Sequence, residues 1–144
     1  MKGFSRTLLV VSLVLLASVA FAQRQHDRYF RALDDLRGAR WMLDHRPGNW
    51  LQSMEERAAV GKIDDAINEI RRAAIDDGRD NNYHPAFDNE ENDRPGRLRH
   101  AEQLIGRARE DIRDAENEGQ FRGLRDRTMK HLDEALADVR RAAR

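Results

Sequence analysis

The chain of 144 residues carries 26 basic and 26 acidic side chains, which balance to a formal net charge of zero. This balance excludes the cationic excess typical of nucleic-acid-binding proteins, and the length favours a single domain. The sequence contains no cysteine. Disulfides, thiol catalysis and a lipid-modified cysteine are therefore excluded, and the core must be held together by packing alone.

Residues 1–22 have the pattern of a secretory signal peptide. A basic start is followed by an apolar run over 8–19 and by the small-x-small cleavage site Ala20-Phe21-Ala22. The run is shorter than the ~20 apolar residues that span a bilayer as a helix. We therefore expect cleavage after Ala22, a periplasmic or secreted mature chain over 23–144, and no membrane anchor after cleavage.

A repeat within the chain predicts the fold. Residues 63–74 return as residues 132–143, and eleven of the twelve positions keep residue type or class. Each copy places apolar residues at i, i+3, i+4 and i+7, which is one face of a helix. A weaker echo relates 34–39 to 110–115. The repeat predicts two related helical hairpins packed into one all-α bundle.

Helical periodicity and chain breakers divide the mature chain into four helices and one long central linker. We expect helices over about 27–44, 53–77, 95–116 and 121–144, with the linker near 78–94. The side chains expected to face the core are Tyr29, Ala32, Leu33, Leu36, Ala39, Leu43, Ala59, Ile63, Ala66, Ile67, Ile70, Ala73, Ala74, Leu98, Ala101, Leu104, Ile105, Ala108, Ile112, Ala115, Phe121, Leu124, Leu132, Ala135, Leu136 and Val139.

Local signals support these boundaries. Ser53 and Glu56 have the spacing of a capping box at the start of the second helix. Pro85 interrupts the linker, which cannot be helical throughout, and the aromatic residues Tyr83 and Phe87 favour contact between the linker and the bundle. Two short turns and one longer link predict an up-down-up-down four-helix bundle.

The histidines and the linker supply two metal-site hypotheses. His100 and His131 lie beside the apolar stripes of the last two helices, so one hypothesis joins them around a metal ion. The other places a cation in the linker, where His84 and Asp88 lie among asparagines and acidic residues. Ordinary hydrogen-bonded histidines and a solvated acidic loop are the alternatives. No histidine follows a glutamate at i−3, so the Glu-x-x-His pattern of di-iron bundles is excluded.

The usual residues for catalysis are scarce. Ser53 is the only serine after residue 22, and its spacing suits a helix cap. There is no glycine-rich phosphate loop, and no carboxylate pair stands in an apolar setting that would shift its pKa. We therefore expect neither enzymatic activity nor a cofactor.

At the level of the whole chain, the signal peptide, the four helices, the long proline-containing link and the turn Asn117-Glu118-Gly119 resemble the periplasmic four-helix b-type cytochromes. The chain also resembles small secreted bacterial helical proteins. The cytochromes hold haem with a methionine near the start of the first helix and a histidine near the end of the last. Neither is present here at 26–30 or 138–144. The resemblance thus implies the fold and argues against haem.

The basic residues are almost all arginines, since Lys62 and Lys130 are the only lysines after residue 22. Arginine forms forked pairs with carboxylates and stacks on aromatic rings. This excess fits ion pairing along the helix faces, or a surface that binds carboxylates or unfolded peptide. Our leading functional hypothesis is an exported, soluble interaction module, adaptor-like or chaperone-like, that binds protein through its arginine-rich faces and central linker. The alternative is a periplasmic metal-binding bundle.

Overall fold

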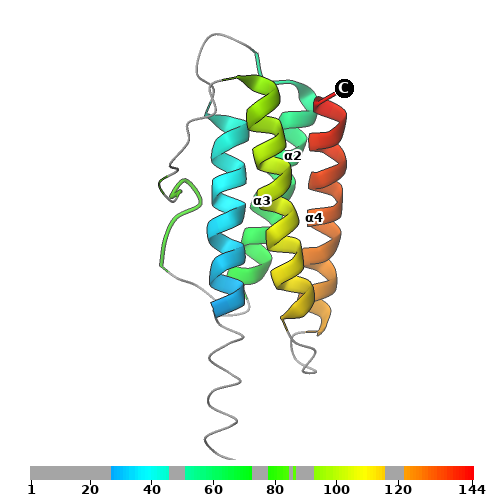
Figure 1. The fold of residues 1–144 in the computed structure, drawn as a ribbon. Coiled ribbons are helices and arrows are strands. Elements are labelled where there is room, and N and C mark those ends of the chain that lie inside the picture. Colours follow the sequence, from blue (N-terminus) through cyan, green and yellow to red (C-terminus); the bar gives the residue numbers. More distant parts are fainter. Residues whose placement is uncertain (1–26, 46–50, 73–77, 85, 87–92, 116–121) are drawn as a thin grey trace, which may run out of the picture.

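A computed structural model describes residues 27–45, 51–72, 78–84, 86, 93–115 and 122–144. This part of the chain contains four helices and no strand. The first helix covers residues 27–44, and it is followed by α2 (Met54–Arg72), α3 (Arg94–Asp114) and α4 (Arg122–Ala142). The four lie side by side (Figure 1), so the predicted all-α four-helix bundle is confirmed.

The predicted apolar stripes form the core. Every residue expected to face inward that the structure describes is buried, and Met42 joins them. Small and large residues alternate along the stripes, which lets the helices approach closely while the leucines and isoleucines fill the centre. Ala73, Ala74 and Phe121 lie outside the described residues, as do the signal peptide and its cleavage site. None of the described helices combines the length and apolarity needed to cross a membrane.

The direction of the third helix differs from the predicted alternation. Arg31 and Asp35 of the first helix pair with Asp111 and Arg107 of α3, so these two helices are antiparallel. α2 is also antiparallel to the first helix, because Gln52, just before α2, donates to the Leu43 carbonyl at the end of the first helix (3.1 Å), while Arg40 pairs with Asp64 further along α2 (2.8 Å). α2 and α3 therefore run in the same direction, and the order is up-down-down-up (Figure 1).

The remaining ion pairs place α4. Lys62 of α2 pairs with Glu134 (2.8 Å), and Arg109 of α3 pairs with Asp133 (2.6 Å). α4 thus lies between α2 and α3 and is antiparallel to both. The first helix is diagonal to α4. Residues 73–93 carry the chain from one end of the bundle back to the other, as a crossover connection.

The helix starts follow the sequence signals. The Glu56 backbone N–H donates to Ser53 Oγ (3.1 Å), and the Ser53 N–H donates to the Glu56 carboxylate, so the capping box is confirmed. Asp93 caps α3 by accepting the N–H of Gly96 (2.6 Å), with a proline in the first turn. Glu56 is itself buried and binds the Nε of Arg94 (3.1 Å), which joins the starts of α2 and α3.

Candidate functional site

Residues 78–84, the longest described stretch of the crossover, are called the strap because they lie along the outside of the first helix (Figure 1). Arg37 has no exposed surface and donates from Nη2 to the backbone oxygen of Arg79 (3.0 Å). The Arg79 side chain donates in turn to Asp34 (2.9 Å). A buried guanidinium is costly unless its charge is compensated. The covered Arg37 therefore ties the strap to the first helix.

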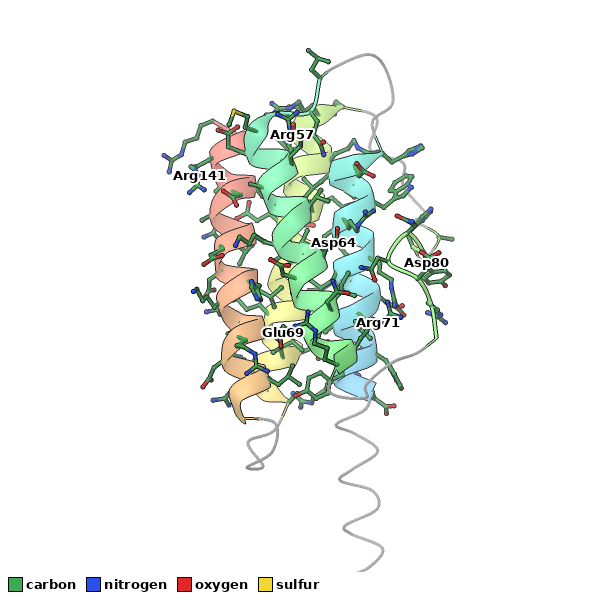
Figure 2. The ribbon with its side chains drawn as sticks, turned by 180° about the vertical axis from the view of Figure 1, so that it is seen from behind. Arg57, Asp64, Glu69, Arg71, Asp80 and Arg141 are labelled. Atoms are coloured by element: carbon green, nitrogen blue, oxygen red, sulfur yellow. The ribbon has the colours of Figure 1, made fainter. Side chains whose placement is uncertain are left out.

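The strap holds its own turn and reaches a second helix. Gly78 opens it at φ 74°, a conformation that glycine adopts without strain. Asp80 Oδ1 accepts the backbone N–H groups of Asn82 and Tyr83, which closes an Asx turn. Asn81 then contacts α2. Figure 2 shows Asp80 on the strap, beside the first helix.

The strap contacts α2 through the amide side chain of Asn81, which binds Arg71 and Asp64. Asn81 Oδ1 accepts from Arg71 Nη1 (3.3 Å), and its Nδ2 donates to Asp64 Oδ1 (3.4 Å). The same Asp64 oxygen accepts from Arg40 Nε of the first helix (2.8 Å). Asp64 and Arg71 both belong to α2 (Figure 2). The strap therefore covers the seam between the first helix and α2.

Aromatic rings gather where the strap meets the first helix. The Trp41 indole stacks with the imidazoles of His45 (centroids 4.8 Å apart) and His84 (4.6 Å). The Arg79 guanidinium lies 4.4 Å from the centroid of the Tyr83 ring, a cation–π geometry. These five residues are called the strap surface. Tyr83 is 40% exposed, and it is one of three large apolar side chains that are exposed in the described part of the chain.

Arg97 supports the strap surface from within the bundle. It is 3% exposed and donates to the backbone oxygens of Met42 (3.0 Å), Trp41 (3.3 Å) and His45. These carbonyls lie at the C-terminal end of the first helix, which attracts a cation, and the Trp41 oxygen also accepts the backbone N–H of His45 (2.7 Å). The same guanidinium lies 4.9 Å from the centroid of the Trp41 ring. Arg97 therefore fixes both the end of the first helix and the indole.

Most other arginines are engaged in ion pairs within the bundle, as the ion-pairing interpretation of the sequence expects. Asp35, in the seam between the first helix and α3, is the most informative partner. Burial raises the pKa of its carboxyl, although Arg107 binds it with two hydrogen bonds (2.8 and 3.2 Å) that oppose the shift. The hydrogen bond to Asp35 raises the pKa of Arg107. The two directions are compatible because the carboxylate loses more hydration than the largely exposed guanidinium.

The proposed metal ligands are not brought together. The pairs Arg109–Asp133 and Arg140–Glu102 fix the register of α3 on α4. In that register His100 lies level with the last turn of α4, roughly 16 Å along the axis from His131. His131 Nδ1 lies instead 3.9 Å from Asp65 of α2.

Of the two linker residues proposed as cation ligands, the structure describes only His84. His84 stacks on Trp41, and Asp88 lies outside the described residues. Among the residues that the structure describes, no group of three or more histidine, aspartate or glutamate side chains is arranged to hold a metal ion.

Sequence reasoning missed Trp41, His45 and Arg97 as parts of a site. Trp41 and His45 are one helical turn apart, a spacing that places two rings on the same face, and this signal was present. The burial of Arg97 carries no such signal, because an arginine in an amphipathic helix is ordinarily exposed. No protein-family model, curated protein or solved structure matches this chain.

Proposed function

We propose that the protein is an exported, non-catalytic interaction module, adaptor-like or chaperone-like, and that it binds protein partners through the strap surface. One observation carries the proposal: where the strap meets the first helix, the Trp41 ring stacks with His45 and His84, and Arg79 lies over the partly exposed Tyr83 ring. Tyrosine, tryptophan and arginine are enriched at the centres of protein interfaces. The arginine-rich helix faces contribute less, because their guanidinium groups already have carboxylate partners.

The strap surface is also held firmly enough to act as a binding face. Arg37, Asn81 and Arg97 anchor its two elements from beneath, through backbone oxygens and carboxylates. A preorganised face loses little conformational entropy when a partner binds. The exposed part of Tyr83 then supplies apolar area, and Arg79, which pairs with Asp34, supports this ring by its cation–π contact.

The test replaces Tyr83 by a photo-crosslinking phenylalanine analogue in the full chain expressed in its native host. We expect covalent adducts to defined proteins of the export compartment, identified by mass spectrometry. The matched control places the same analogue at Leu51, which is 89% exposed but lies at the end of the bundle. Adducts that are identical at both positions, or absent at both, would contradict the proposal.

The chaperone-like form makes a separate prediction. Purified mature protein should suppress the aggregation of a reduced or heated client protein at near-stoichiometric ratio, as followed by light scattering. Tyr83→Ser should weaken this suppression about tenfold in the required ratio, which corresponds to the loss of one interface anchor worth roughly 1.4 kcal/mol. Leu51→Ser should leave it unchanged. If the wild type shows no suppression over a wide range of ratios, the adaptor-like form alone remains.

A further inference from the structure

Repeat-related residues make matching contacts in the two halves of the bundle, as an internal two-fold rotation would produce. Hairpin 1 is the first helix with α2, and hairpin 2 is α3 with α4. Extending the weaker repeat by one turn aligns Arg31 with Arg107 and Asp35 with Asp111. Arg31 binds Asp111 through Nη2 (2.8 Å) and Nε (3.2 Å), and Arg107 binds Asp35 through the same atoms at the same distances. Each pair is therefore the image of the other.

The second contact between the hairpins, α2 against α4, repeats the relation. The stronger repeat aligns Lys62 with His131 and Asp65 with Glu134. Lys62 pairs with Glu134 (2.8 Å), and His131 lies 3.9 Å from Asp65. Corresponding positions are also buried together, as Ile63, Ala66, Ile67 and Ile70 are with Leu132, Ala135, Leu136 and Val139.

Related pairs also occur within the helices. Glu69 binds Arg72, and the corresponding Asp138 binds Arg141. The symmetry is broken where the strap lies, because Arg37 is fully buried beneath it while the corresponding Arg113 of α3 is exposed. The surface between the hairpins therefore resembles the interface of a two-fold homodimer. In such an interface both halves contribute the same set of residues.

Each hairpin needs that surface to be covered. α4 has a more extensive contact with α2, which belongs to the other hairpin, than with α3, its own hairpin partner. A hairpin alone would leave Ile63, Ile67 and Ile70 facing water, and each has no exposed surface in the bundle. Full exposure of such a side chain costs roughly 1.5–3 kcal/mol. A hairpin without its own partner therefore gains by taking the equivalent hairpin of another chain.

The crossover is long enough for hairpin 2 to pack on hairpin 1 of its own chain or on hairpin 1 of another chain. An extended chain of the length of residues 73–93 reaches roughly 70 Å, whereas α2 is only roughly 28 Å long. Residues 85–93 alone, beyond the strap, reach roughly 30 Å. The strap can therefore stay on the first helix of its own chain while hairpin 2 enters a neighbouring bundle.

We propose that the surface between the hairpins also takes a second copy of this chain. Two molecules exchange hairpins and form a closed two-fold dimer, in which each bundle is built from hairpin 1 of one chain and hairpin 2 of the other. All the contacts between hairpins are kept, so the exchange is governed by protein concentration during folding. This inference is independent of the proposed partner-binding function.

Two charge-reversed variants of the full chain test the proposal. One carries Arg31→Asp with Asp35→Arg, and the other carries Arg107→Asp with Asp111→Arg. In either variant alone, like charges face one another across the seam between the first helix and α3. When the two are refolded together, exchange restores opposite charges in both bundles of the mixed dimer.

We expect the equimolar mixture to give a species of twice the monomer mass that contains one copy of each variant, as seen by native mass spectrometry. Its urea midpoint should return to that of the wild type, above the midpoint of either variant alone. The control chain carries all four substitutions, which restores the pairs within one molecule, so its midpoint should also match the wild type. A mixture that contains only monomers with the lowered midpoints would overturn the proposal.

A second measurement needs no substitution. Wild-type protein refolded over a range of concentrations should contain a dimer whose fraction rises with concentration, as measured by light scattering after chromatography. The isolated dimer should return to monomer only after unfolding and dilute refolding, since exchange requires the hairpins to separate. Wild-type protein that stays monomeric up to millimolar refolding concentrations would equally overturn the proposal, whatever the charge-reversed variants do.

Discussion

At the scale of single residues, the buried charges contribute most to the specificity of the structure. Arg97 joins the end of the first helix, the indole of Trp41 and the start of α3. Arg37 has the corresponding role beneath the strap. Sequence patterns did not predict either burial, because periodicity counts apolar residues and treats every arginine as exposed. The number of arginines indicated ion pairing along the helix faces, but no sequence signal distinguished the two arginines that are buried.

Replacing Arg97 by methionine should lower the free energy of unfolding by roughly 3 kcal/mol. The substitution keeps apolar volume but leaves the carbonyls of the first helix without their charged donor, and such bonds contribute roughly 1.5–3 kcal/mol. Urea unfolding measures the change. Arg99→Met, an exposed position on the same helix, is the matched control and should change stability by less than about 0.5 kcal/mol. Equal effects of the two substitutions would mean that Arg97 does not hold the helix end.

Asp35 and Glu134 should give opposite pH dependences. Burial raises the pKa of Asp35, so the folded state binds its proton more tightly. Its contribution is favourable at acid pH and is lost as the pH rises from about 4, the ordinary aspartate value, through the raised pKa. The hydrogen bond from Lys62 lowers the pKa of Glu134, so its contribution is present above about pH 4.3 and is lost as the pH falls.

These signs are separable by measuring urea midpoints between pH 3 and pH 7. On acidification, Asp35 should stabilise the wild type, and Asp35→Asn should lack this gain. Glu134 should destabilise the wild type on acidification, and Glu134→Gln should lack this loss. The two differences should therefore diverge in opposite directions as the pH is lowered. If both variants shift the curve with the same sign, the pKa of Asp35 is not raised by folding.

At the scale of the helices, the sequence predicted what each element buries but not which way it runs. The 3-4 spacing identified the buried stripes because only one face of each helix is apolar. Alternating and crossover arrangements bury the same stripes, so periodicity does not distinguish them. The length of residues 73–93 was the available signal, since a turn between adjacent antiparallel helices needs only a few residues.

The stripe of α2 can be tested by placing a charge on it. Ile70 is fully buried against the other helices, and Ile70→Asp leaves a carboxylate without a partner. Such a charge costs several kcal/mol out of a total stability of roughly 5–15 kcal/mol. We expect loss of the cooperative thermal transition in circular dichroism. Ala58→Asp, on the exposed side of the same helix, should melt within a few degrees of the wild type.

At the scale of the whole molecule, the crossover decides which ends of the helices are neighbours. Because the chain contains no cysteine, pairs of introduced thiols report on this directly. Glu55→Cys with Arg99→Cys places both thiols near the starts of α2 and α3, which the pair Glu56–Arg94 holds together. A short bis-maleimide should link them within one chain.

The matched pair is Arg72→Cys with Arg99→Cys, which an alternating bundle would bring close and the observed bundle separates by most of its length. Mass spectrometry after unfolding distinguishes a cross-linked chain from a chain modified twice. We expect cross-linking of the first pair and double modification of the second. The reverse result would restore the alternating topology.

The crossover also sets an order of events during protein synthesis. α2 packs on α4, and about 70 residues separate the completion of these two helices during synthesis. At typical translation rates that interval is roughly 4–14 s, whereas helices form in microseconds. During this interval the apolar face of the first hairpin is uncovered in the nascent chain. Other copies of the chain, being translated from the same messenger RNA, expose the same face. Slower elongation over the second half of the gene should then increase the yield of exchanged dimers.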